Sequence, residues 1–247
     1  MLSIVRHGFL NVCVQLVHTM LPQRCLLCGA PAPPASPVAG APAAHALLCA
    51  DCDADLPRLA AARCTVCALP LPSGAVCGAC LNRPPRFDRV SAPYAYRFPV
   101  DALIHAFKYG GRLAHAAPLA AALAGIVPRD ADVIVPMPLA PRRLAQRGFN
   151  QALELARVVA ARTRIALAAD ACRKVLDTVP QAALPWQERA KNVRRAFVCD
   201  ADFTGLRVAV VDDVLTTGAT LSEIARVLRR AGAISVAGWV VARTLPR

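Results

Sequence analysis

Two patterns of apolar and polar positions alternate in the C-terminal two thirds of the chain. Continuous apolar runs predict buried strands at residues 132–138, 207–213 and 234–242. Apolar residues recurring at helical spacing predict helices at 101–109, 114–126, 150–163 and 220–231. Strands that are apolar on both faces and alternate with helices are typical of a parallel sheet covered on both sides. We therefore expect an α/β fold that binds ligands where strands end and helices begin, at 212–220 and 136–143.

The first 22 residues carry a wide apolar stripe at helical spacing. Asn11, Gln15 and His18 interrupt the apolar run, and no small-residue cleavage pattern follows, so a short helix is favoured over a signal peptide. No run reaches the roughly 18 apolar residues of a membrane span, so a cytoplasmic protein without membrane insertion is expected. A Pro/Ala/Gly-rich loop is expected at 29–44.

Eight cysteines form four C-x-x-C pairs within residues 25–80. The spacing lets both thiolates of a tight turn reach one metal ion, and four such pairs favour zinc over a redox pair or a disulfide scaffold. Zinc held by four thiolates is structural, since no coordination position stays open for chemistry. The expected ligands are Cys25, Cys28, Cys49, Cys52, Cys64, Cys67, Cys77 and Cys80.

The pairing of these cysteines is open at the level of sequence. Twenty residues separate the first two pairs and nine separate the last two, so each consecutive quartet is compatible with one site. Two zinc sites built from consecutive quartets are favoured. Crossed pairing, first with third and second with fourth, is the alternative.

The segment "VAVVDDVLTTGATL" (208–221) carries the strongest sign of ligand chemistry. A loop that opens a helix presents free backbone N–H groups to a phosphate, and Gly218 lets the backbone approach it closely. Asp212 and Asp213, directly before the loop, can accept hydrogen bonds from sugar hydroxyls or face a Mg²⁺ ion that the substrate brings. The segment therefore predicts a site for a 5′-phosphorylated ribose. The alternative, an acidic strand end with a threonine cap, leaves the paired charges unexplained.

The net charge of +13 favours an anionic partner, although an arginine-rich coding bias supplies an alternative explanation. Aromatic residues make up only 5% of the chain, so a platform for stacking nucleic-acid bases is not evident.

Several motifs together resemble a known family. The strand-end segment resembles the phosphoribosyl-pyrophosphate (PRPP) signature of type I phosphoribosyltransferases. Nearly the whole chain is similar to the competence protein F (ComF) family, through the cysteine-rich front end and the motifs "FKYGGR" (107–112), "VPMPLAPRRLAQRGFNQALELA" (135–156), "TVPQAALPWQERAKNVRRAF" (178–197) and "ART" (242–244). This resemblance implies an N-terminal helix (1–24), a double zinc ribbon (25–85) and a phosphoribosyltransferase-like domain (86–247).

The resemblance also implies roles for individual residues. Asp212 and Asp213 would contact the ribose hydroxyls of PRPP and take part in catalysis, and Arg189, with Lys191, would stabilise the leaving pyrophosphate from a loop at 173–192. The 5′-phosphate loop would comprise Thr216, Thr217, Gly218, Ala219 and Thr220. The pyrophosphate region would comprise Pro136, Met137, Arg142, Arg143 and Arg147.

Thr216 bears on the acceptor. Family members that act on 6-oxopurines have a carboxylate at this position, so the resemblance argues against guanine or hypoxanthine. Two functions follow: Mg²⁺-dependent phosphoribosyl transfer to an unidentified acceptor, or a non-catalytic PRPP-fold protein that binds single-stranded DNA. In either case, the family implies a role in DNA uptake during natural transformation, with competence-machinery proteins as partners.

Overall fold

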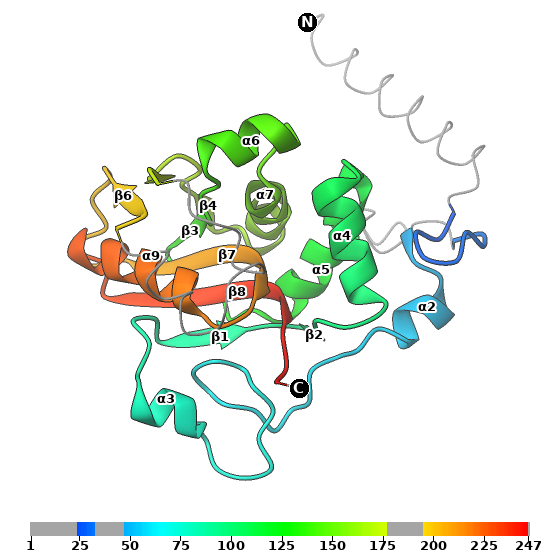
Figure 1. Cartoon of the computed structure of the whole chain (residues 1–247), viewed down its shortest axis with the longest axis horizontal. Coiled ribbons are helices and arrows are strands. Elements are labelled where there is room, and N and C mark those ends of the chain that lie inside the picture. Colours follow the sequence, from blue (N-terminus) through cyan, green and yellow to red (C-terminus); the bar gives the residue numbers. More distant parts are fainter. Residues whose placement is uncertain (1–23, 33–46, 177–194, 247) are drawn as a thin grey trace, which may run out of the picture. The chain divides into compact units, whose positions relative to one another are not determined.

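The computed structural model describes residues 24–32, 47–176 and 195–246 (Figure 1). The chain divides into two compact units, residues 1–56 and 57–247. In the first unit the described helix is α2 (Ala50–Ala54), which begins directly after Cys49. The expected helix over residues 1–22 and most of the expected loop at 29–44 lie outside the described residues. The division into segments 1–24, 25–85 and 86–247 stays a prediction.

A parallel sheet forms the centre of the second unit. Its strands follow the order β1-β8-β7-β3-β4, and β2 pairs with the end of β8. Every pair in this sheet is parallel, which confirms the fold class expected from the apolar strands. The strands are β1 (Arg89–Ser91), β2 (Tyr94–Ala95), β3 (Val133–Pro136), β4 (Ala166–Leu167), β7 (Arg207–Leu215) and β8 (Ser235–Arg243).

Strand β7 runs two residues further than the sequence predicted. It was expected to end at residue 213, but Val214 and Leu215 still pair with Ala242 and Arg243 of β8. The two acids therefore lie within the last part of the strand, and the predicted phosphate loop starts only at Thr216.

The four helices predicted for the second unit are present with similar bounds, whereas α3 and α6 were not predicted. Helix α9 (Ala219–Arg230) follows its N-cap Gly218 and ends before Gly232, close to the range that its apolar stripe predicted. The helix expected over 114–126 starts as a short 3-10 turn, η2 (Leu113–His115). The α-helices are α3 (Gly78–Asn82), α4 (Val100–Tyr109), α5 (Ala116–Ile126), α6 (Pro141–Arg147), α7 (Gln151–Thr163) and α9 (Ala219–Arg230). Within the described ranges, no helix combines the length and apolarity needed to cross a membrane.

The two faces of the sheet are covered by different helices. Val208 and Val210 of β7 share a buried cluster with Leu221 and Ile224 of α9. Successive side chains of a strand point to opposite faces, so Ala209 and Val211, which are fully buried, face the other side. Helices α5 and α7 pack on each other and contact β8, β7 and β3, and we infer that they cover that other face. Figure 1 shows α9 beside β7 and β8, away from α5 and α7.

A separate antiparallel pair lies outside the main sheet. Strands β5 (Cys172–Lys174) and β6 (Phe197–Cys199) pair with each other, and Arg173 meets Asp200 at 2.5 Å. The loop predicted at 173–192 therefore begins as a strand, because residues 173 and 174 hydrogen-bond to β6. Arg189 and Lys191 lie outside the described residues.

Candidate functional site

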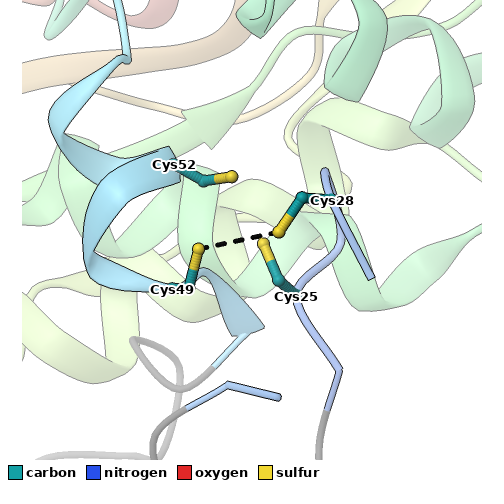
Figure 2. A group of neighbouring side chains, drawn as sticks. All are labelled: Cys25, Cys28, Cys49 and Cys52. Atoms are coloured by element: carbon teal, nitrogen blue, oxygen red, sulfur yellow. Dashed lines mark hydrogen bonds between the residues drawn. The ribbon is translucent and has the colours of Figure 1, made fainter. Parts of the chain in front are cut away.

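The eight predicted ligand cysteines form two groups of four. The first contains Cys25, Cys28, Cys49 and Cys52, which turn their sulfur atoms toward one another (Figure 2). The second contains Cys64, Cys67, Cys77 and Cys80 and is buried. Consecutive quartets therefore come together, as favoured from the sequence, and the crossed pairing is wrong.

The sulfur positions fit a tetrahedral zinc ion. Within each quartet the ligand atoms lie within 4.8 Å of one another. The Sγ atoms of Cys28 and Cys49 are 3.7 Å apart, and those of Cys67 and Cys77 are 3.6 Å apart. A Zn–S bond of about 2.3 Å in a tetrahedron places the sulfurs about 3.8 Å apart. Two four-cysteine zinc sites thus fit the chain.

The quartets share one local architecture. In each, the third cysteine, Cys49 or Cys77, caps a short helix. The residue after the second cysteine has a left-handed backbone in both, with φ of 73° at Gly29 and 60° at Ala68. The two ribbons are therefore built alike, although glycine occupies this position in one and alanine in the other.

A small cavity lies at the carboxyl end of β7, where α9 begins. Its volume is about 40 Å³. Of the predicted ligand residues, Asp212, Thr216, Gly218 and Thr220 line it, together with Val214, Leu215, Leu221 and Val240. The cavity is thus bordered by one carboxylate and two hydroxyl-bearing residues at a helix N-terminus, where an anion is favoured.

The two neighbouring acids have different surroundings. Asp212 borders the cavity, and one of its oxygens, Oδ1, accepts a hydrogen bond from the Asp213 backbone N–H. Asp213 is only 3% exposed, and its Oδ2 lies 2.6 Å from Nζ of Lys108 on α4. The strand therefore presents one acid to the cavity and holds the other in an ion pair.

Burial shifts the pKa values of Asp212 and Lys108 toward pH 7. Burial raises the pKa of Asp212 to about 6, although the nearby cations Lys108, Lys174 and Arg147 oppose this change. Burial lowers the pKa of Lys108 to about 8, opposed by Asp212 and assisted by Arg147 and Arg143. Such shifts, away from the usual values and next to a cavity, are typical of functional sites.

The loop before α9 is shaped by Gly218. Its φ of 81° is left-handed, and an added Cβ would lie 3.3 Å from the ring of Phe87. Thr217 Oγ1 accepts a hydrogen bond from the Ala219 backbone N–H at 3.1 Å. Thr217 and Ala219 therefore fix the turn by bonding each other, while Thr216 and Thr220 border the cavity.

The predicted pyrophosphate region begins on the adjacent strand. Pro136 ends β3 opposite Val211, and the Met137 backbone N–H donates to the Val211 carbonyl at 2.8 Å. Asn150 caps α7 and also donates to the Met137 carbonyl at 3.1 Å. The structure thus brings the segment after β3 beside the end of β7.

The three predicted arginines of α6 differ in their surroundings. Arg147 is half-buried, donates to Gln151 and lies 5.2 Å from the centre of the Tyr109 ring. Arg143 is half-buried, and its charge helps to lower the pKa of Lys108. Arg142 is exposed. Arg143 and Arg147 therefore lie close enough to Lys108 for their charges to affect its pKa.

Sequence reasoning missed three residues of this region. Lys108 lies in "FKYGGR" and Arg243 in "ART", two motifs that carried the family resemblance without an assigned role. Phe87 follows the double-proline boundary and packs against Gly218. The presence of Lys108 and Arg243 in these motifs was the available signal. Their contacts could not be predicted, because Asp213, the partner of Lys108, is 105 residues away along the chain. Leu215, a partner of Arg243, is 28 residues away.

Comparison with known proteins confirms the predicted double zinc ribbon and the resemblance to the competence protein F family. A double zinc ribbon domain family matches residues 16–81. The chain is 34% identical over 195 residues to DNA utilization protein YhgH of Salmonella typhimurium, covering 74% of this chain and 84% of the relative. It is also 34% identical over 179 residues to competence protein F of Haemophilus influenzae, covering 68% and 78%.

Similarity to solved structures is partial. The allosteric regulatory enzyme of purine biosynthesis overlaps 49% of this chain and 24% of its own, with a TM-score of 0.33 and 25% identity. A purine phosphoribosyltransferase from Pyrococcus horikoshii overlaps 48% and 65%, with a TM-score of 0.29 and 24% identity.

Proposed function

This chain belongs to the family of competence protein F and DNA utilization protein YhgH, and from this premise we propose that it binds PRPP with Mg²⁺ at the end of β7. One observation carries the proposal: a carboxylate, two threonines and a left-handed glycine border one cavity at the N-terminus of α9. The helix N-terminus suits the 5′-phosphate, and the carboxylate suits a sugar hydroxyl or a metal ion.

The division of labour between the acids follows from their surroundings. Asp212 faces the cavity and is the acid that meets the ribose or the Mg²⁺ ion. Asp213 is held by Lys108 at 2.6 Å, so it acts with that lysine as an ion pair beside the ligand. Arg143 and Arg147 supply positive charge for the pyrophosphate, and arginine binds phosphate oxygens with two parallel hydrogen bonds.

The activity that this arrangement supports is phosphoribosyl transfer to an unidentified nitrogen acceptor. The bond between ribose C1 and pyrophosphate breaks, pyrophosphate takes the electron pair, and the acceptor nitrogen forms the new bond to C1. Charge that develops on the leaving pyrophosphate is stabilised by cations fixed in advance, here Arg143 and Arg147. Arg189 of the segment outside the described residues is proposed to add to this charge. When bound together with PRPP, Mg²⁺ would supply further positive charge for the pyrophosphate.

The test measures PRPP binding and pyrophosphate release. Calorimetry with Mg²⁺ and PRPP should show binding to the wild type and at least roughly tenfold weaker binding to Asp212→Asn. Asp130→Asn is the matched control, because Asp130 pairs with Arg89 and lies before β3, at the other end of the sheet. Pyrophosphate release is then screened across nitrogen acceptors. Absent PRPP binding contradicts the site, whereas binding without release for any acceptor contradicts only the transfer.

A second candidate function is binding of single-stranded DNA by the arginines of α6 and by exposed aromatic side chains in and before α4. Tyr109 is 68% exposed and carries the Arg147 guanidinium over its ring, and Phe98 is 77% exposed. Although aromatic residues are few, these two can therefore stack on bases. Affinity for an oligonucleotide should fall steeply with salt and drop further in Tyr109→Ala. Salt-insensitive binding, or none, contradicts this function.

A further inference from the structure

Arg243 connects the second cysteine quartet to the predicted phosphate loop. It is the last residue of β8 and is 5% exposed. Its Nε donates a hydrogen bond to the Cys67 carbonyl at 2.9 Å, and its Nη1 donates to the Leu215 carbonyl at 3.0 Å. Nη1 also donates to the Thr216 carbonyl. One guanidinium thus holds the backbone of a cysteine ligand and the two residues at which β7 passes into the loop.

Apolar packing joins the same two regions. Ala68, the residue after Cys67, is 1% exposed and belongs to the buried cluster that contains Leu215 and Leu221. Val66 packs against both this cluster and the four cysteines. The second ribbon therefore shares one buried cluster with the end of β7 and the start of α9.

The backbone at Ala68 has a conformation that is unfavourable for alanine. Its φ of 60° is left-handed, which costs about 1 kcal/mol or more for a residue with a Cβ atom. The equivalent position of the first ribbon is Gly29, where an added Cβ would meet nothing within 4 Å. Only in the second ribbon does a methyl group at this position pack against the core.

Charge provides a third connection. A zinc ion with four thiolates carries a net charge of −2. The buried Arg243 guanidinium donates hydrogen bonds to carbonyl and hydroxyl oxygens, which accept these bonds without neutralising its charge. A buried cation is costly unless a negative charge lies near it. The loaded quartet, which reaches Arg243 through Cys67, supplies that charge.

We propose that the second quartet, when it holds zinc, positions the PRPP loop through Arg243, so that zinc occupancy and PRPP affinity are coupled. This inference rests on the proposed function for the ligand. Arg243 is a positioning residue, because it holds the loop by its carbonyl groups and does not line the cavity. The first quartet lies in the other compact unit and provides the matched comparison.

The experiment uses the full zinc-loaded chain and compares Cys80→Ser with Cys52→Ser. PRPP affinity should fall about tenfold in Cys80→Ser and stay within about twofold of wild type in Cys52→Ser. Coupling between sites is reciprocal, so saturating Mg²⁺–PRPP should raise the zinc affinity of the second quartet by the same factor in a chelator competition. Equal effects of the two serine variants, or none, would overturn the proposal.

Arg243→Lys is the second variant, in case Cys80→Ser does not fold. Lysine keeps the charge but cannot bond the carbonyls of Cys67 and Leu215 together in one planar fork. We expect two zinc ions still bound, weaker PRPP binding, and a zinc–PRPP coupling factor close to one. Wild-type coupling in Arg243→Lys contradicts the inference.

A ligand-free readout separates this inference from the proposed function. Amide hydrogen exchange at residues 214–220 should speed up in Arg243→Lys and Cys80→Ser but not in Cys52→Ser. If the wild type fails to bind PRPP, the proposed function is wrong, while the exchange rates still decide whether the second quartet positions the loop. Unchanged exchange in Arg243→Lys and Cys80→Ser overturns the inference.

Discussion

Lys108 and Asp213 form an ion pair that joins α4 to the end of β7, with 2.6 Å between Nζ and Oδ2. The side chains are 19% and 5% exposed, so both charges are largely removed from water. This pair fixes the position of Asp213 beside the cavity and leaves Asp212 as the acid that faces it.

The first prediction concerns this pair. Lys108→Met leaves the Asp213 carboxylate buried without its partner and should lower the free energy of unfolding by about 3 kcal/mol. The measurement is urea unfolding at pH 7. Arg157→Met is the control, since Arg157 pairs with Glu154 at 2.6 Å on an exposed helix surface and its loss should cost no more than about 1 kcal/mol. Equal costs for the two variants would show that the Lys108 pair behaves as a surface pair.

The second prediction is a pH dependence that arises from Asp212. Its pKa is raised from 3.8 to about 6 in the folded chain, so the folded state binds this proton more tightly than the unfolded state. The resulting stabilisation is complete below pH 4 and is lost as the pH rises through 6. Unfolding curves of Asp212→Asn should lack this contribution, so the stability difference between variant and wild type should grow in favour of the variant from pH 4 to pH 7. A difference that stays constant over this range argues against a raised pKa.

The third prediction tests the loop glycine. Gly218→Ala places a Cβ at a left-handed φ of 81° and 3.3 Å from the Phe87 ring, so it should cost about 1–3 kcal/mol of stability and weaken PRPP binding. Gly205→Ala is the matched control, because its φ is 77° and its Cβ would meet nothing within 4 Å. The control should lose stability through strain and keep its PRPP affinity. Loss of PRPP affinity in both variants would mean that Gly218→Ala acts through overall destabilisation and not through the shape of the loop.

The fourth prediction concerns the metal. Protein purified without chelators should contain two zinc ions per chain by elemental analysis, one for each quartet. Cys52→Ser and Cys80→Ser should each reduce the content to about one. A single ion in the wild type, or loss of both ions in either variant, would contradict two independent sites.

Much of the fold follows from local patterns in the sequence. The apolar runs of β3, β7 and β8 and the stripe of α9 were readable because each element is buried along its whole length or along one face. The end of β7 could not be predicted from the sequence, because Asp212 and Asp213 are polar. The pairing of Leu215 with Arg243 also depends on a strand that begins 20 residues further along the chain.

The residues of the candidate site also fall into two classes, those that a local sequence pattern indicates and those that depend on tertiary contacts. The segment 212–220 indicated its chemistry by itself, because carboxylates, threonines and a glycine meet at one helix start. Lys108, Phe87 and Arg243 gave no such indication, since each acts through a partner on another element. Their roles come from tertiary contact, which one sequence does not display.

The boundary between the two compact units falls after Leu56, inside the matched double zinc ribbon. The matched family covers both ribbons as one domain, yet the second ribbon belongs to the compact unit that contains the sheet and the first does not. A chimera joined after the ribbons, near residue 85, would replace the second ribbon, which packs with the sheet, together with the first. Joining at Pro57 instead exchanges only the first ribbon, which makes that ribbon the replaceable part of this architecture.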